Sequence, residues 1–137
     1  MPQIDVNWLA IFVSAVVSMV IGFLWYGPLF GKQWMKLMDM TEKNMQGAKK
    51  GMQAMYAKSF VTMLVLGYVL AVFVGISGDG NVTEGALTGF WLWLGFMATT
   101  GFTETLFSGK SMNLFFINTG YQLAYMLVMG GMLAAWK

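Results

Sequence analysis

The sequence predicts an all-α polytopic membrane protein whose four transmembrane helices form an antiparallel bundle. Hydrophobic residues make up 58% of the chain and charged residues only 10%, against about 45–50% and about 25% in ordinary soluble domains. Four apolar stretches are long enough to cross a bilayer, which takes roughly 20 residues of helix. Turn-forming residues separate these stretches. We therefore expect a single transmembrane domain over residues 1–137.

The four expected spans cover residues 6–26, 56–76, 83–107 and 113–136. Gly27-Pro28 is expected to end the first span, because proline cannot continue the hydrogen-bond ladder of a helix. The turn cluster Ser77-Gly78-Asp79-Gly80-Asn81 ends the second. Thr83 is the expected N-cap of the third span, with Glu84 placed favourably in its first turn.

The segment 29–55 between the first two spans is predicted to be helical as well. Around Trp34, apolar residues alternate with lysines in an amphipathic pattern, which is typical of a short helix lying in the membrane interface. Farther on, Met45, Ala48 and Met52 recur at helical spacing. Because no proline interrupts that pattern, we expect one long helix from about Glu42 to Ile76.

The distribution of lysine predicts the orientation. Short loops on the cytoplasmic side of membrane proteins carry an excess of positive charge. On one side of the four spans only Lys137 is found, and the other side holds seven lysines: Lys32, Lys36, Lys43, Lys49, Lys50, Lys58 and Lys110. Both termini are therefore expected outside, with the segment 29–55 and the Lys110 turn in the cytoplasm.

Several motifs resemble one known family. They are NWLA (residues 7–10), LWYGPLFGKQWMK (24–36), WLGF (93–96) and LFSGKSMNLFFINTGYQL (106–123). In these motifs and in its length, the chain is similar to the domain of unknown function 1761 family, a group of small bacterial inner-membrane proteins. The resemblance covers nearly the whole chain. It implies four spans and a place in the bacterial inner membrane, and it implies no activity.

Absent residue types restrict the possible chemistry. The chain has no cysteine and no histidine, so thiolate metal sites and the commonest proton shuttle are excluded. Two methionine pairs, at 35/38 and 52/55, have a spacing suited to a soft Cu(I) ion. One face of a helix gives the same spacing, so we expect no cofactor and no enzymatic activity. A net charge of only +2 makes nucleic acid an unexpected partner.

Glu104 is the one carboxylate expected inside a span. Ionisable groups in membranes are costly and often functional, so Glu104 is a candidate proton or cation site. Its possible oxygen-bearing partners on the third and fourth spans are Thr100, Thr103, Asn118 and Gln122. Alternatively, Glu104 reaches headgroup water only about 6 Å away or pairs with Lys110, and the polar residues of the fourth span simply join helices.

Small residues recur every fourth position along the spans. Such stripes let helix backbones approach closely in lipid, and the candidate packing residues are Ser14, Ser18 and Gly22 in the first span, Gly67, Ala71 and Gly75 in the second, and Gly95, Thr99 and Thr103 in the third. Further stripes at 85/89 and 130/134 exceed what one bundle requires. We therefore expect a homo-oligomer or a companion membrane protein.

Two functions remain open at this point. The favoured hypothesis is a non-catalytic membrane subunit or scaffold that self-associates or binds a partner. The alternative is an oligomeric channel or transporter for protons, cations or a small solute, which would use Glu104 and the polar face of the fourth span.

Overall fold

The computed structural model describes residues 6–37 and 52–136, and within these ranges every regular element is helical, which confirms the all-α prediction. Two of the apolar stretches, the first and the third, are built from more than one element. The elements are α1 (Trp8–Leu24), the π-helical segment η1 (Trp25–Leu29), α2 (Gly31–Leu37), α4 (Met52–Ser77), α5 (Val82–Leu92), the π-helical segment η2 (Trp93–Ala98), α6 (Thr99–Ser108) and α7 (Met112–Ala135).

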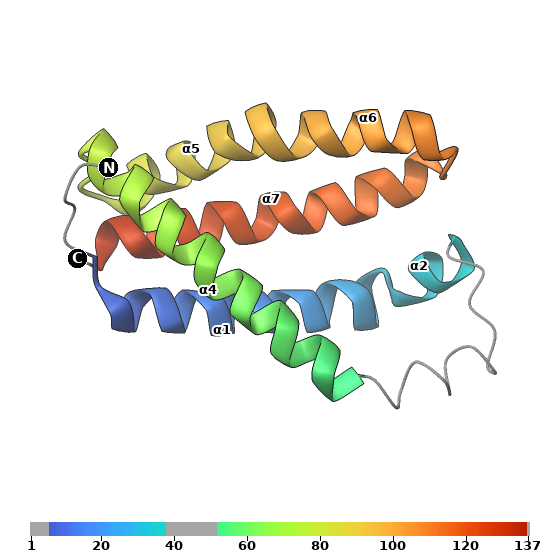
Figure 1. The fold of residues 1–137 in the computed structure, drawn as a ribbon, viewed down its shortest axis with the longest axis horizontal. Helices are drawn as coiled ribbons and strands as arrows, with labels where there is room; N and C mark the ends of the chain where they lie inside the picture. Colours follow the sequence, from blue (N-terminus) through green and yellow to red (C-terminus); the bar gives the residue numbers. More distant parts are fainter. Residues whose placement is uncertain (1–5, 38–51, 137) are drawn as a thin grey trace.

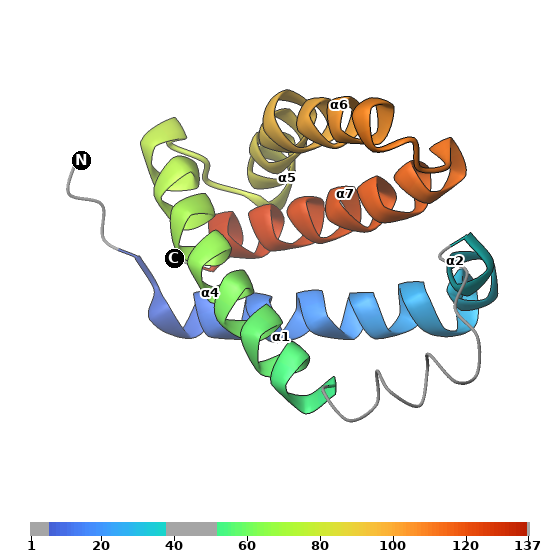
Figure 2. The same cartoon turned by 45° about the vertical axis from the view of Figure 1, so that its right-hand side comes forward.

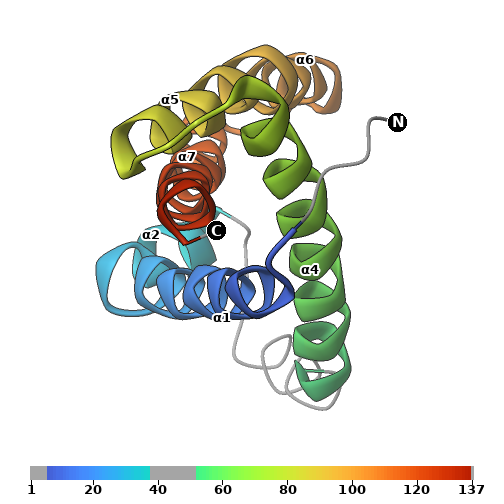
Figure 3. The same cartoon turned by 90° about the vertical axis from the view of Figure 1, so that its left-hand side faces the viewer.

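Helix α7 lies at the centre of the arrangement. Figure 1 shows α1, α7 and the continuous α5–η2–α6 helix running along the long axis, with α4 crossing them diagonally. Helix α7 contacts α1, α4 and α5, and the rotated views of Figures 2 and 3 show it between α1 and the α5–α6 helix. Successive long helices alternate in direction, so the arrangement is antiparallel with one strongly tilted member.

The backbones of α5 and α7 meet at glycines. A Cβ atom built on Gly85 would collide with the carbonyl oxygen of Gly130, and one on Gly89 with the carbonyl oxygen of Met126. Both α5 glycines and Gly130 are buried, as is Ala134 one turn farther along α7. The stripes 85/89 and 130/134, from which contacts to another protein were expected, therefore pack against each other within one chain.

The small residues of α1 also pack within the chain. Ser14 and Ser18 are fully buried, and their hydroxyls donate to the carbonyl oxygens of Ile11 (2.9 Å) and Ala15 (2.6 Å) of the same helix. A Cβ on Gly67 of α4 would lie 3.3 Å from the side chains of Ile11 and Met129. These positions let α1, α4 and α7 come together around one apolar core.

The remaining stripe residues differ in their surroundings. Gly22 faces the ring of Tyr121, and Ala71 and Gly75 are half-buried on α4. Gly95 has open space where a side chain would stand, and Thr99 is exposed. The stripe beginning at Gly95 is therefore not used by this chain's own packing.

The expected helix stop at Gly27-Pro28 was wrong, since the helix continues through Pro28 to Leu29. A proline ring normally clashes with the carbonyl four residues earlier. The wider π turn avoids this clash, and the Phe30 N–H instead donates to the carbonyl oxygen of Trp25, 2.9 Å away. The following turn depends on Gly31, where a Cβ would lie 2.6 Å from the carbonyl oxygen of Tyr26.

The N-cap of α5 was also misplaced at Thr83. The side chain of Asn81 accepts a hydrogen bond from the Glu84 N–H at 2.9 Å. The Glu84 carboxylate in turn accepts from the Gly80 N–H at 2.8 Å. This reciprocal arrangement resembles a capping box, and asparagine ranks above threonine as an N-cap, which explains why the helix starts earlier.

Two helices, Trp8–Leu29 and Gln53–Ser77, are long and apolar enough to cross a membrane, which favours membrane association. The helices over residues 82–108 and 112–135 do not meet the same criterion. Helix α2 contains Trp34 of the expected interfacial helix. The expected extension of α4 back to Glu42 lies outside the described residues.

The α5–α7 contact predicts a sharp difference between two glycines. Gly89→Ala should destabilise the protein by about 1–3 kcal/mol, because the new methyl group meets backbone that cannot move aside. Gly80→Ala is the control, since its methyl group meets open space, and its effect should stay within about 0.5 kcal/mol. Unfolding transitions in mixed micelles measure both, and equal effects would contradict the contact.

Candidate functional site

The structure divides the polar residues singled out in the sequence into two groups. Glu104, Thr100 and Thr103 are exposed on α6, whereas Asn118 and Gln122 are half-buried on α7. The hydroxyls of Thr100 and Thr103 donate to carbonyl oxygens of their own helix, at Phe96 and Thr99. Within the described part of the chain, no hydrogen bond joins Glu104 to Asn118, Gln122 or Lys110. The two groups are therefore separate surfaces.

The internal group is completed by three tyrosines. The Tyr26 hydroxyl donates to Asn118 Oδ1 at 2.6 Å. The ring of Tyr26 meets that of Tyr121 edge-on at 5.4 Å, and Tyr121 meets Tyr125 at 5.0 Å. The Tyr121 hydroxyl donates to the carbonyl oxygen of Ser18 at 3.0 Å. We call Tyr26, Asn118, Tyr121 and Tyr125 the tyrosine cluster, and it joins α1, η1 and α7.

Two tryptophans hold α7 beside this cluster. The indole N–H of Trp25 donates to the carbonyl oxygen of Ile117 at 2.8 Å, and that of Trp93 donates to the carbonyl oxygen of Thr119 at 2.9 Å. Ile117 and Thr119 are two positions apart, which corresponds to a rotation of about 200° around the helix axis. The two indoles therefore hold α7 from nearly opposite sides. Each tryptophan begins a π-helical segment and each is followed by the pattern x-Gly.

Segment η2 changes which face of its helix points toward α7. In a uniform α-helix, the face that holds 85 and 89 would continue through 96, 100 and 103. The structure instead brings Met97 to the core and Gly101 against Phe115 and Thr119 of α7, while Thr105 is half-buried. The wider π turn thus advances the buried stripe by one residue. π-Helical segments of this kind are frequent at functional sites.

The consequence is an outward polar face on α6. Thr99, Thr100, Thr103 and Glu104 are all exposed there, and we call these four residues the α6 polar face. Large apolar side chains flank the face, including Phe107, which is 89% exposed. A uniform helix would have turned Thr100 and Thr103 inward against α7.

One buried carboxylate was not singled out in the sequence. Asp79, in the turn after α4, is only 7% exposed and accepts a hydrogen bond from the Thr88 hydroxyl at 2.6 Å. Its backbone N–H donates to the carbonyl oxygen of Val74 at 3.2 Å. The sequence indicated only a turn here, and the structure shows in addition that the Asp79 side chain bonds this turn to α5.

The polar groups of this region are hydrogen-bond donors and acceptors fixed between helices. Across residues 6–37 and 52–136, no three His, Cys, Asp or Glu residues gather in a manner suited to a metal ion. In the tyrosine cluster, the hydroxyls of Tyr26 and Tyr121 join helices. The α6 polar face, by contrast, presents its carboxylate outward.

The Tyr26–Asn118 hydrogen bond predicts measurable coupling between η1 and α7. In a double-mutant cycle, Tyr26→Phe and Asn118→Ala should each destabilise the protein, with a coupling energy of about 0.6 kcal/mol, typical of hydrogen bonds between membrane helices. Tyr68→Phe is a control, because its hydroxyl makes no hydrogen bond to the described residues. Strict additivity in mixed-micelle unfolding would mean that the bond does not form.

Comparison with known proteins identifies the family of the chain. No curated protein and no solved structure is significantly similar to the chain. One family model, described as "Protein of unknown function (DUF1761)", matches residues 9–134. This match covers nearly the whole chain, including both π-helical segments and all of the tyrosine cluster, and the chain therefore belongs to the DUF1761 family.

Proposed function

We propose that this protein crosses the bacterial inner membrane four times and is a non-catalytic membrane subunit or scaffold that self-associates through the α6 polar face. Both termini face outward in this proposal, and the lysine-rich segment between the first two spans faces the cytoplasm. The absence of cysteine and histidine from the sequence supports a role without catalysis.

Exposed apolar side chains on every long helix support four spans. Soluble monomers rarely expose large contiguous apolar surfaces, yet here the exposed residues include Phe12 and Phe23 on α1, Phe73 on α4, Trp91 on α5 and Phe116 on α7. At 1.5 Å per residue, residues 82–108 and 112–135 extend about 40 Å and about 36 Å, which exceeds the roughly 30 Å of a bilayer core.

Because α7 lies at the centre of the molecule, its polar residues are compatible with a membrane span. Neighbouring helices cover α7, and Asn118 has its amide oxygen bonded to Tyr26. A span shielded in this way needs less hydropathy than one facing lipid, because its polar groups meet partners in the protein. This accounts for the moderate hydropathy of α7 without removing it from the membrane.

The α6 polar face is the observation that carries the proposed self-association. Polar and ionisable groups in a membrane helix almost always face protein or a water-filled cavity, yet those of α6 face away from their own chain. Gly95, with open space above it, extends the face into a small-residue stripe with Thr99 and Thr103. Such a stripe allows close approach of a second helix, and a second copy of the chain would cover these polar groups.

The same face favours one alternative function. In an oligomer, Glu104 of each subunit would lie at or near the interface, where a ring of carboxylates could line a cation path. An oligomeric channel or transporter for protons, cations or a small solute is therefore the second candidate. The fourth span contributes less to this candidate than the sequence suggested, because Asn118 is bonded inside the subunit.

Self-association predicts a protein mass above that of the 15.2 kDa chain in mild detergent. The double variant Thr99→Leu, Thr103→Leu should return to the monomer mass, because leucine packs against lipid as well as against protein and its bulk separates the helices. Thr62→Leu on α4 is the matched control, as Thr62 is likewise exposed and donates to its own helix. Light scattering corrected for the bound detergent measures the protein mass of each variant. A monomer mass for the natural chain would contradict self-association.

A flux assay in the same experiment separates the two candidates. Proteoliposomes containing a scaffold should leak protons and cations no faster than empty liposomes. A channel should give a flux that Glu104→Gln reduces while leaving the oligomer mass unchanged.

A further inference from the structure

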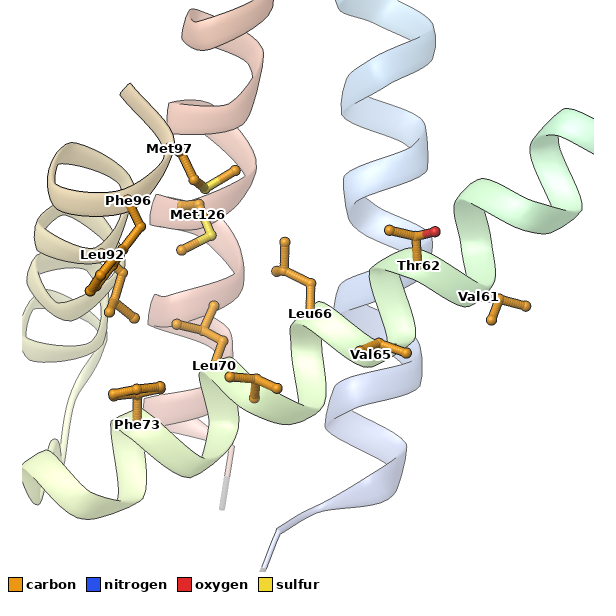
Figure 4. Close-up of a pocket in the computed structure, with 11 residues that line it drawn as sticks. Val61, Thr62, Val65, Leu66, Leu70, Phe73, Leu92, Phe96, Met97 and Met126 are labelled. Atoms are coloured by element: carbon orange, nitrogen blue, oxygen red, sulfur yellow. The ribbon is translucent and has the colours of Figure 1, made fainter. Parts of the chain in front are cut away.

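An apolar groove of about 550 Å³ opens between α4 and the α5–η2 helix (Figure 4). We call it the α4 groove. One wall is formed by α4 and the other by α5 and η2, with Met126 of α7 between them. Its lining residues are Val61, Thr62, Val65, Leu66, Val69, Leu70, Phe73, Leu92, Phe96, Met97 and Met126.

The α4 groove is suited to a hydrocarbon chain. Thr62 is the only lining residue with a polar side chain, and its hydroxyl donates to the carbonyl oxygen of Lys58 at 2.9 Å within α4. From Val61 to Phe73 the groove follows α4 for about 18 Å. One leaflet of a bilayer core is about 15 Å thick, so the groove is as long as the acyl chains of one leaflet.

A lysine stands at one end of the α4 groove. Residues 58, 62, 65, 69 and 73 follow one face of α4 at steps of three and four residues. The exposed Lys58 therefore lies one turn before the groove, on the same face. Lysine stems lie along apolar surface while the ammonium reaches polar surroundings, which places a positive charge where a lipid headgroup would sit.

We propose that the α4 groove binds an acyl chain of an anionic phospholipid, with its phosphate paired to Lys58. This inference rests on the proposed membrane position of the protein. A helix from a second copy fits less well, since an apolar lining with a lysine at one end matches a single apolar chain that carries an anionic headgroup. The unbranched side chains of Met97 and Met126 can adapt to a flexible chain.

Native mass spectrometry of the delipidated protein, titrated with phosphatidylglycerol or phosphatidylcholine, tests this proposal. Phosphatidylglycerol should bind more tightly than phosphatidylcholine. Val65→Trp should strongly weaken binding of both lipids, because the indole would obstruct the middle of the groove. Lys58→Ala should weaken phosphatidylglycerol alone by about fivefold, the usual contribution of one lysine near anionic headgroups.

Two matched variants control for general effects. Val20→Trp adds the same bulk at an exposed position of α1, and Lys110→Ala removes a lysine from the turn before α7. Neither should change lipid binding. Unchanged binding by Val65→Trp would refute the groove as a lipid site, and a loss of oligomer mass in that variant would assign the groove to a second copy instead.

The membrane position is tested separately in the same preparation. Recovery of the chain from cells without detergent would contradict the proposed function itself. A chain that needs detergent but whose Val65→Trp variant still binds lipid would contradict only the inference about the groove.

Discussion

The close backbone contact between α5 and α7 determines where the other helices can lie. Gly85, Gly89 and Gly130 leave no space for a side chain between the two helices. In the membrane position proposed above, no hydrophobic effect would draw these helices together, so backbone approach of this kind would supply much of the attraction. With α5 fixed on one side of α7, α1 packs on another side of α7, and α4 crosses α1 and α7. The polar middle of α7 is enclosed as a result.

Enclosure of α7 and the π turn of η2 together explain the distribution of polar groups. Asn118 meets Tyr26 in the interior, and the indoles of Trp25 and Trp93 bond to α7 carbonyl oxygens. Because η2 advances the buried stripe by one residue, Gly101 takes the inward position that Thr100 would occupy in a uniform helix. The chain thus satisfies its internal polar groups while leaving one polar face outside.

Apolar patterning in the sequence was enough to predict the helices, their order and their approximate ends, because long apolar stretches have few alternatives to helix. It also identified Ser14, Ser18 and Gly67 as packing positions. It did not identify η1, since Pro28 normally stops a helix, nor η2, because the Trp-x-Gly pattern that begins both π-helical segments is equally compatible with an α turn. Because η2 was not predicted, Glu104 of α6 and Asn118 of α7 were grouped in one candidate site from the sequence. The structure places them in separate locations. The tyrosine cluster was predicted only in part: Asn118 was singled out, but Tyr26 lies 92 residues away in the sequence and nothing there connects the two.

Cysteine accessibility in intact cells tests most directly whether the chain crosses the membrane four times, and the natural chain contains no cysteine to interfere. Single cysteines are placed at Asn81 before α5, at Ser108 at the end of α6 and at Ala135 at the end of α7. Four spans predict that an impermeant thiol reagent labels positions 81 and 135 and that position 108 is labelled only after the cells are opened. Equal labelling of all three positions in intact cells would mean that α5–α6 and α7 do not cross the membrane, and would contradict the account.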